Sequence, residues 1–324
     1  MRALVLDQDW HFVEDYPIPE PPPGEALIRV HVAGICNTDL ELARGYLHFH
    51  GVAGHEFVGV VEAAPGAEAW EGRRVVGDIN AACGVCATCR AGRPTHCPHR
   101  TTLGIEGRDG AFADYLTLPV RNLYAVPDTL PDEFAVFTEP LAAACEILEQ
   151  VHIHPTDRVI VLGDGKLGLL CAQVLALTGC DLTVIGRHSE KLDILAHLGI
   201  TTLHIPRGTT AEPAEIMGTA DVVVEATGHP DGYITARKLL RPRGTLILKS
   251  TYHRTMETDL SRIVVDEIRL VGSRCGPFAP ALRLLERGLV NVGSLIQARY
   301  PFAEILAALH HAEHPGTLKV LVTM

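Results

Sequence analysis

The spacing of hydrophobic and polar positions changes partway along the chain. In the first part, short apolar runs at residues 26–32, 57–63 and 74–78 are separated by turns rich in proline and glycine, such as Pro-Pro-Pro-Gly at 21–24. Each run has the length and composition of a β-strand. The pattern predicts a β-rich domain and not a series of βαβ units.

After Glu139, continuous apolar strands alternate with helix-like segments. The predicted strands are residues 158–162, 181–185, 220–226, 244–249 and 268–272. The predicted helices are residues 141–151, a segment that ends near 177, and residues 189–198. Apolar strands that alternate with helices are typical of a doubly wound parallel sheet with helices on both faces. The tail is predicted to form helices at 279–287 and 302–312 and a last strand at 319–323.

The composition and charge narrow the classes of partner. Hydrophobic residues make up 47% of the 324 residues, which is enough for a sizeable core and two domains. The formal net charge is -11, whereas a protein that binds along nucleic acid or an anionic membrane is expected to be basic. The N-terminal residues show no secretory signal, and the longest apolar run, 167–177, is too short to span a bilayer. We therefore expect a cytoplasmic protein that binds neither nucleic acid nor membranes.

Four cysteines lie close together in the first part of the chain. Cys83, Cys86, Cys89 and Cys97 are separated by two, two and seven residues. Four thiolates complete the tetrahedral coordination of a structural zinc ion and leave no position open for substrate. The spacing therefore predicts a structural zinc site. The residues alone leave open an iron–sulfur cluster, a disulfide pair or four unrelated cysteines.

A second set of candidate metal ligands is spread over three segments. These are GICNTDL with Cys36, GHEFVG with His55 and Glu56, and TEPLA with Glu139. Thiolate, imidazole and carboxylate together suit zinc, and a catalytic zinc keeps one position open for water or substrate. The residue types alone do not separate this interpretation from a small buried cysteine and a structural His–Glu pair.

A glycine-rich turn follows the strand predicted at 158–162. It reads G-D-G-K-L-G, with Gly163, Gly165 and Gly168 at the fingerprint positions and Lys166 and Leu167 between the last two. Between a strand and a helix, this pattern is typical of dinucleotide binding, because the glycines permit a tight turn, close approach to the pyrophosphate and close strand–helix packing. The N-terminus of the helix that follows faces the phosphates.

The end of the next strand indicates which dinucleotide is bound. NAD sites carry an acid there, which binds the ribose hydroxyls. Here the strand ends in Gly186, Arg187, His188 and Ser189, with Lys191 two residues further on. A glycine leaves room for a 2′-phosphate, and Arg187 can bind it with two parallel hydrogen bonds, assisted by Ser189 and Lys191. The sequence thus predicts NADP in preference to NAD, with solvated surface charges as the alternative interpretation.

Taken in order, GICNTD, GHEFVG, the four cysteines, TEPLA and the glycine turn resemble the medium-chain, zinc-dependent alcohol dehydrogenases, over essentially the whole chain. The resemblance implies an α/β protein with two domains. Residues 1–148 and 275–324 would form a GroES-like, β-rich catalytic domain, and residues 149–274 a Rossmann cofactor domain. It also implies a homodimer or homotetramer.

The resemblance gives roles to individual residues. Cys36 and His55 would bind a catalytic zinc, with Glu56 or Glu139 as a further ligand as the site opens and closes. Glu139 stands where one branch of the family has a third ligand cysteine, which favours the polyol, threonine and sugar dehydrogenase branches. The later strand ends would add cofactor contacts from Thr227, Gly228, Ser250, Thr251, Gly272 and Arg274.

The segment after Cys36 carries the expected proton relay. By resemblance, the hydroxyl of Thr38 takes part in proton transfer, and Asp39 orients the zinc site. Many relatives have a histidine five residues after the ligand cysteine, whereas this chain has Glu41. The resulting pattern, C-x-T-D-x-E, resembles archaeal-type glucose dehydrogenases.

These motifs together predict hydride transfer between a small alcohol, polyol or sugar and NADP(H), by an enzyme with one catalytic and one structural zinc per chain. A reductase that works toward the alcohol is an alternative direction of the same chemistry. A non-catalytic NADP(H)-binding sensor or subunit of the same fold is an alternative of another class, and the complete set of ligand types argues against it. A quinone reductase of the same superfamily would lack both zinc sites.

Overall fold

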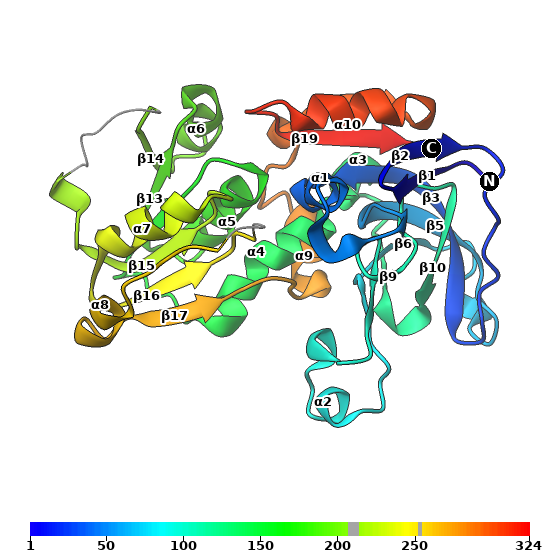
Figure 1. Ribbon diagram of the computed structural model, residues 1–324, viewed down its shortest axis with the longest axis horizontal. Coiled ribbons are helices and arrows are strands. Elements are labelled where there is room, and N and C mark those ends of the chain that lie inside the picture. Colours follow the sequence, from blue (N-terminus) through cyan, green and yellow to red (C-terminus); the bar gives the residue numbers. More distant parts are fainter. Residues whose placement is uncertain (207–213, 252–254) are drawn as a thin grey trace. The chain divides into compact units, whose positions relative to one another are not determined.

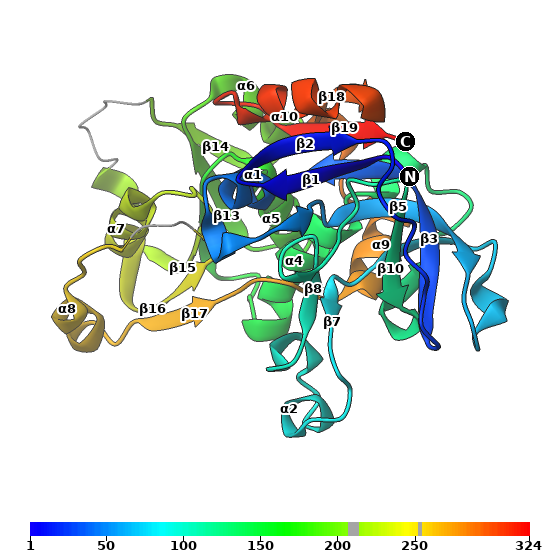
Figure 2. The ribbon, with the colours of Figure 1, turned by 45° about the vertical axis from the view of Figure 1, so that its right-hand side comes forward.

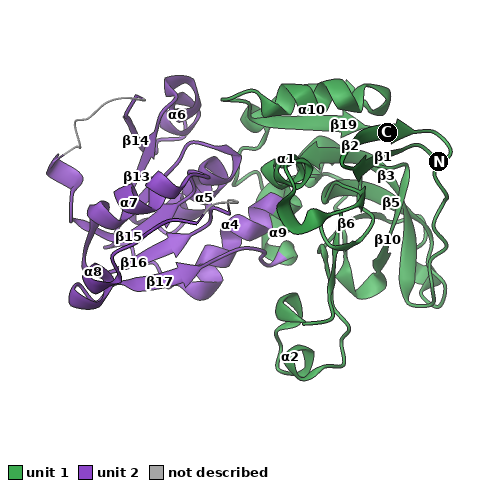
Figure 3. Cartoon of the chain, viewed as in Figure 1, with its two compact units in different colours: residues 1–139, 278–324 green, residues 140–277 purple. Residues whose placement is uncertain are grey.

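The computed structural model describes residues 1–206, 214–251 and 255–324, which fall into two compact units. Unit 1 contains residues 1–139 and 278–324, and unit 2 contains residues 140–277 (Figure 3). Both chain ends lie in unit 1 (Figures 1 and 2). No helix of the described part has the length and hydrophobicity needed to cross a bilayer.

The largest sheet of unit 1 is built around β3 (Glu25–Ile35). Its strand order is β11-β6-β5-β3-β19-β18, and β10 also pairs with β3. Alternate residues are buried in the first part of β3, as expected for a strand with one covered face, whereas its last four residues are all buried. Because β19 (Lys319–Thr323) pairs antiparallel with β3, the tail of the chain completes the sheet of the N-terminal part.

The other elements of unit 1 are short. The strands are β1 (Ala3–Asp7), β2 (Asp9–Val13), β4 (Gly51–Val52), β5 (Glu56–Ala63), β6 (Arg74–Gly77), β7 (Asn80–Ala81), β8 (Thr101–Leu103), β9 (Gly107–Arg108), β10 (Tyr115–Pro119), β11 (Leu123–Ala125) and β18 (Ile296–Pro301). The helices are α1 (Asn37–Ala43), α2 (Ala87–Arg90), α3 (Asp132–Ala135), α9 (Phe278–Glu286) and α10 (Ile305–Glu313). The segment around α2 projects from unit 1 as a lobe (Figure 1).

Three strand ends of the large sheet meet at one edge. In the β3–β5 pair, Gly34 lies opposite Glu56, and in the β3–β19 pair, Ile35 lies opposite Val320. The residues directly after β3, at the start of β5 and at the start of β19 therefore come together. This register places Cys36, Glu56 and Lys319 side by side, although they are far apart in the sequence.

Unit 2 contains a six-stranded parallel sheet with the order β14-β13-β12-β15-β16-β17. Its strands are β12 (Arg158–Leu162), β13 (Asp181–Gly186), β14 (Thr201–His204), β15 (Ala220–Glu225), β16 (Leu240–Leu248) and β17 (Arg269–Gly272). Its helices are α5 (Lys166–Ala176), α6 (Ser189–Ala196), α7 (Pro230–Leu239) and α8 (Leu260–Val265). In chain order the strands run 3-2-1-4-5-6, the Rossmann order. The predicted doubly wound parallel sheet is confirmed.

The switch point of this sheet lies between β12 and β15, where the direction of winding reverses. Ligands of doubly wound sheets bind outside the carboxyl ends of the strands at this point. Helix α4 (Thr138–Gln150) leads from unit 1 into unit 2, and it begins at Thr138, before the segment 141–151 that the sequence predicts. Glu139 is therefore part of the first turn of a helix.

Candidate functional site

The first candidate site is formed by residues that follow or begin strands of the large sheet in unit 1. Cys36 follows β3 and is the N-cap of α1, while His55 and Glu56 stand at the start of β5. The candidate ligand atoms of these three residues all lie within 4.8 Å of one another. His55 and Glu56 are buried. The structure thus brings together three of the four residues predicted as catalytic zinc ligands.

One buried carboxylate holds two of these residues in place. Asp39 Oδ2 accepts a hydrogen bond from the backbone N–H of Cys36 at 2.8 Å, and Asp39 Oδ1 lies 3.1 Å from His55 Nδ1. Because Nδ1 is engaged, Nε2 is the ring nitrogen that His55 can offer to a metal. Burial lowers the pKa of His55, but the charge and hydrogen bond of Asp39, with a contribution from Cys36, outweigh it and raise the pKa well above 6.5.

Glu56 lies between the buried ammonium of Lys319 and the candidate metal site. Its Oε2 accepts a hydrogen bond from Lys319 Nζ, and both side chains are buried. Its Oε1 is also buried and has no hydrogen-bond partner among the described residues. A Cβ on Gly34 would collide with Oε2, so the glycine of β3 makes room for this carboxylate.

The donor set fits zinc. A thiol, an imidazole nitrogen and a buried carboxylate oxygen without a partner converge within 4.8 Å, and each is a ligand type that zinc prefers. A buried carboxylate oxygen without a partner is costly, and because Lys319 binds Oε2 of Glu56, Oε1 still needs a hydrogen-bond donor or a metal ion. The geometry of the described residues therefore supports a cation at this position.

Glu139 is not part of this three-residue group. Its side chain is partly buried, and desolvation raises the pKa of its carboxyl to about 7, against the opposing positive charge of His55. It is close enough to His55, Glu56 and Lys319 for their charges to affect it.

Thr38 and Glu41 both lie on α1, directly after Cys36. Thr38 Oγ1 is 3.8 Å from Cys36 Sγ, so its hydroxyl lies beside the candidate metal ligands. Glu41 accepts a hydrogen bond from Arg44 at 2.6 Å. The residue that replaces the usual relay histidine is therefore held in an ion pair with the residue that ends the same helix.

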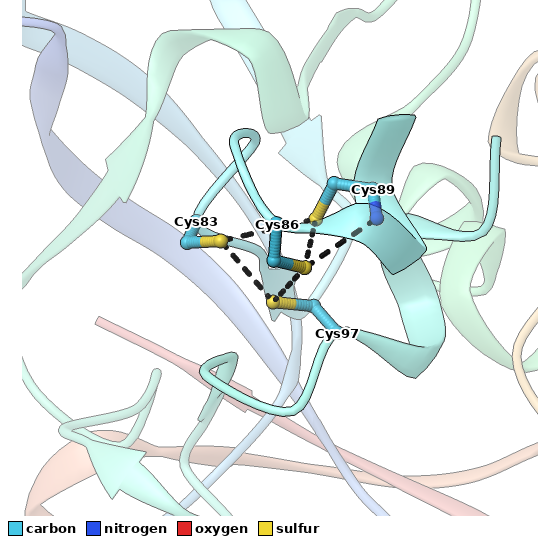
Figure 4. Close-up of side chains that lie close together, drawn as sticks. All are labelled: Cys83, Cys86, Cys89 and Cys97. Carbon is cyan, nitrogen blue, oxygen red and sulfur yellow. Dashed lines mark hydrogen bonds between the residues drawn. The ribbon is translucent and has the colours of Figure 1, made fainter. Parts of the chain in front are cut away.

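The four cysteines of the lobe form a second candidate metal site (Figure 4). Their sulfurs point toward one another, with separations of 3.5 Å for Cys86–Cys89 and Cys83–Cys97, 3.8 Å for Cys86–Cys97 and 4.0 Å for Cys83–Cys89. Four sulfurs about 2.3 Å from one tetrahedral ion would be about 3.8 Å apart. None of these four cysteines forms a disulfide. The arrangement matches a single ion bound by four thiolates.

The glycine turn of unit 2 has the geometry of a dinucleotide cradle. Gly163 has φ 122°, and a Cβ there would lie 2.5 Å from the carbonyl oxygen of Ala226. A Cβ on Gly168 would collide with the carbonyl of Gly163, so strand and helix approach closely only because both residues are glycine. Gly165 is the N-cap of α5, and nothing lies within 4 Å of its Cβ position. Lys166 and Leu167 form the first turn of α5.

The tip of β13 differs from the sequence-based expectation in one respect. The sequence predicts that Gly186 leaves room for a 2′-phosphate, but the side chain of Asp164 occupies the space beside it, and a Cβ on the glycine would lie 2.6 Å from Asp164 Cβ. Arg187 and Ser189 are exposed beyond the strand end. Lys191 is buried, and burial lowers its pKa, so its amine is less available to a ligand than the guanidinium of Arg187.

The predicted contacts after β15 and β16 are organised by one buried acid, Glu225. Its Oε1 accepts hydrogen bonds from the backbone N–H of Thr227 at 2.8 Å, from the Thr227 hydroxyl at 2.6 Å and from the Ser250 hydroxyl at 3.0 Å. Ser250 Oγ in turn accepts the N–H of Gly228 at 2.8 Å. Thr227, Gly228 and Ser250 therefore form one network at the carboxyl ends of adjacent strands.

Gly272 and Arg274 lie near the end of β17, the edge strand of the sheet. The carbonyl of Gly272 accepts a hydrogen bond from Gln150 Nε2 at 3.2 Å, and the carbonyl of Arg274 accepts one from Lys249 Nζ at 3.2 Å. These bonds connect the end of β17 with the last residue of α4 and with the residue that follows β16.

Sequence reasoning missed three charged residues at these sites: Asp164, Glu225 and Lys319. All three are buried. Asp164 lies in the turn after β12, Glu225 is the last residue of β15, and Lys319 is the first residue of β19. A charged residue next to a continuous apolar run is the signal that could have identified them, since a buried charge requires a partner.

Two family models match the chain, one for the alcohol dehydrogenase GroES-like domain over residues 22–128 and one for the glucose dehydrogenase C-terminus over residues 132–324. The chain is 30% identical to the sorbitol dehydrogenase of Halalkalibacterium halodurans, and the alignment covers 100% of this chain and 99% of that protein. The predicted combination of a GroES-like and a Rossmann domain is confirmed.

Two solved structures resemble the whole chain at 28% identity. One is the alcohol dehydrogenase rspB of Escherichia coli CFT073 in complex with NADH, with a TM-score of 0.90 and coverage of 100% of this chain and 99% of that chain. The other is a zinc-binding dehydrogenase of Sinorhizobium meliloti 1021 bound to NADP, with a TM-score of 0.88 and the same coverage. Similar proteins thus bind either nicotinamide dinucleotide.

Proposed function

The chain belongs to the zinc-dependent medium-chain alcohol dehydrogenase family, in its polyol and threonine branch, and from this premise we propose that it moves hydride between a polyol or sugar carbon and NADP. Membership makes it an alcohol or polyol dehydrogenase that uses a nicotinamide cofactor. The observation that carries the proposed zinc dependence is the buried group of Cys36, His55 and Glu56, with Glu56 Oε1 left without a hydrogen-bond partner among the described residues.

The proposed chemistry assigns a task to each residue of this group. Zinc held by Cys36, His55 and Glu56 would supply Lewis-acid polarisation of the substrate oxygen. Asp39 fixes the ring of His55 and the backbone of Cys36. In the oxidative direction, Thr38 would pass the proton of the substrate hydroxyl on to solvent, and a bound nicotinamide dinucleotide would supply the acceptor for the hydride, which leaves a carbonyl on the substrate. The reverse reaction consumes the same proton and hydride.

The proposed preference for NADP rests on Arg187. Its guanidinium is exposed at the tip of β13, where a 2′-phosphate would lie, and it can form two parallel hydrogen bonds to a phosphate. His188 and Ser189 follow it at the start of α6, and we propose them as further contacts.

The proposed substrates carry several hydroxyl groups. Glu41 and Arg44 form an ion pair at the helix that also carries Thr38, and both groups can bind hydroxyls of a polyol or sugar. The relatives' names point the same way, since they include a sorbitol and an erythritol/L-threitol dehydrogenase.

We also propose that the chain forms a homodimer through the edge of the sheet in unit 2. Strand β17 lies at that edge and exposes Leu270, and α8, which precedes it in the chain, exposes Leu260, Val264 and Val265. An edge strand beside exposed apolar side chains is a site for pairing with a second chain.

A turnover assay with both dinucleotides tests the proposed function. Reduction of NADP and NAD is followed at a fixed substrate concentration with aldoses, polyols, threonine and simple alcohols. Turnover with a sugar or polyol, and a higher kcat/KM for NADP than for NAD, supports the proposal. Tight binding of NADPH without turnover of any substrate in the panel would instead favour the non-catalytic alternative.

A further inference from the structure

The glycine turn of unit 2 carries an acid whose side chain lies at the end of the neighbouring strand. Asp164 follows the first glycine of the turn and is only 7% exposed. Its Oδ2 accepts hydrogen bonds from the backbone N–H groups of Arg187 at 2.6 Å and His188 at 2.7 Å, and the Nδ1 atom of the His188 ring lies 3.0 Å away. Asp164 follows β12 in the chain, but its carboxylate therefore lies at the carboxyl end of the neighbouring strand β13.

Strand register and a missing side chain make this placement possible. Leu162 at the end of β12 pairs with Ile185 of β13, so the turn after β12 lies beside the tip of β13. A Cβ on Gly186 would stand 2.6 Å from Asp164 Cβ and 2.7 Å from Asp164 Oδ2. Any residue larger than glycine at position 186 would displace the carboxylate. Gly186 and Asp164 therefore form a matched pair.

This pair places a carboxylate where dinucleotide-binding folds usually have one. An acid at the end of the second strand accepts hydrogen bonds from the ribose hydroxyls of NAD and repels the 2′-phosphate of NADP. The usual acid is absent from this chain, because its position is Gly186, but a carboxylate reaches the same place from the glycine turn. Oδ1 of Asp164 lies 3.2 Å from Nδ1 of the His188 ring, and a carboxylate oxygen has two lone pairs, so it can also accept a ribose hydroxyl.

Asp164 and Arg187 would have opposite effects on a phosphate at the 2′-position of the adenosine ribose. The guanidinium of Arg187 is exposed and favours a phosphate. The backbone N–H of Arg187 holds the carboxylate of Asp164 in place. A dianionic phosphate beside a fixed carboxylate is destabilised, and the burial of the carboxylate weakens solvent screening of that repulsion.

We propose that Asp164 is a specificity-determining residue of the cofactor site, which accepts a hydrogen bond from the adenosine ribose of NAD and opposes the 2′-phosphate of NADP. The inference rests on the proposed function in that it takes the glycine turn as the dinucleotide site. It limits the preference that Arg187 gives to NADP, so the discrimination between the two dinucleotides is set by the balance of these two residues.

The test compares wild type with Asp164→Asn, which keeps the shape of the side chain and removes its charge. The ratio of kcat/KM for NADP to that for NAD is expected to rise about tenfold or more, because a repulsion of the phosphate and a charged hydrogen bond to the ribose are lost together. Asp193→Asn is the matched control, since it removes the same charge from an exposed position of α6 and should leave the ratio unchanged. A ratio that stays within twofold of wild type in Asp164→Asn, or that falls, overturns the proposal.

Binding of adenosine 2′,5′-bisphosphate and of AMP, measured by calorimetry, provides a second readout that needs no turnover. In Asp164→Asn the affinity for the bisphosphate should rise relative to that for AMP, whereas in Asp193→Asn it should not. An enzyme that turns over no substrate but shows this shift contradicts the proposed function and supports the role of Asp164. If Asp164→Asn does not fold, Asp164→Ser takes its place, because a hydroxyl still accepts one backbone N–H, and the same shift is expected.

Discussion

Asp39 positions two of the residues that we propose as zinc ligands. It holds the backbone of Cys36 and the ring of His55 at the same time, and it is completely buried. The carboxylate selects the His55 tautomer that leaves Nε2 available. The geometry of the proposed ligands therefore depends on a residue outside the proposed ligand group.

We expect Asp39→Asn to weaken zinc binding at this site by roughly 10–100-fold, because an amide neither supports the imidazole with a negative charge nor fixes its tautomer. Competition with a chelator of known affinity measures the change. Asp7→Asn is the matched control, since Asp7 forms a similar contact with His50 at 3.1 Å but on the surface. Equal zinc affinity in wild type and Asp39→Asn would remove Asp39 from this role.

Lys319 balances the charge of Glu56 in the interior. The pair is almost completely buried, and the ammonium of Lys319 also lies 5.7 Å from the centre of the Phe137 ring. Burial lowers the pKa of Lys319, but the charges of Glu56 and Cys36 outweigh this effect and raise it. The amine therefore stays protonated throughout the neutral range.

Replacing Lys319 with Met should destabilise the metal-free protein by about 3–5 kcal/mol, because it leaves a buried carboxylate without its cation. Urea unfolding after chelation measures this loss. The double variant Lys319→Met, Glu56→Gln should recover part of it, since the unbalanced charge is gone. A loss below about 1 kcal/mol in the single variant would show that the pair does not carry this energy.

Among the elements of unit 1, the lobe around α2 depends on its sulfurs. The α2 helix has only four residues, and no residue from 83 to 96 is buried, so the lobe has no apolar core of its own. Hydrogen bonds from the backbone N–H groups of Val85 and Cys86 lower the pKa of Cys83 to about 6, whereas desolvation and the thiol of Cys86 raise the pKa of Cys89. Without a metal, only part of the group therefore favours the thiolate that would bind zinc.

Replacing Cys97 with Ser should reduce zinc from two ions per chain to one and expose the lobe to proteolysis between residues 83 and 97. Metal analysis and mass spectrometry of the cleaved protein measure both effects. Cys180→Ser is the control, because Cys180 lies outside both candidate metal groups. A lobe that keeps its zinc and its protease resistance in Cys97→Ser would contradict a four-thiolate site.

Five of the six strands of unit 2 could be predicted from the sequence, because their apolar runs are continuous and the sheet is covered on both faces. The sequence analysis missed the edge strand β14, whose residues are exposed or only partly buried and form no continuous apolar run. The segment at 158–162 is an example, since it coincides with β12. The glycine turn could be predicted as well, because its three glycines lie close together in the sequence, directly after a predicted strand.

Contacts between distant strands could not be predicted in the same way. Lys319 and Glu56 are 263 residues apart and meet only because β19 and β5 both pair with β3. Asp164 reaches the tip of β13 only through the register of β12 and β13. A single sequence contains no local signal for such pairings, so the sequence identified the residue types of the site but not their counter-ions.

For the molecule as a whole, the proposed dimer depends on exposed apolar residues at the edge of unit 2. Val264 and Val265 are 74% and 72% exposed, values that are unfavourable for adjacent apolar side chains in solution unless a partner covers them. The double variant Val264→Glu, Val265→Glu should halve the mass measured by light scattering. Leu177→Glu, which changes an exposed leucine after α5, should not. A monomeric wild type, or a charged double variant that remains dimeric, would contradict the proposed interface.

The proposed reaction depends above all on a catalytic zinc held by Cys36, His55 and Glu56, and Cys36→Ser removes one of these ligands. Zinc per chain and turnover are measured on the same samples, with NADPH binding as evidence that the cofactor domain is folded. We predict that wild type contains two zinc ions per chain, and that Cys36→Ser contains one, binds NADPH normally and loses activity by at least about a hundredfold. Two zinc ions and undiminished turnover in Cys36→Ser would contradict this assignment.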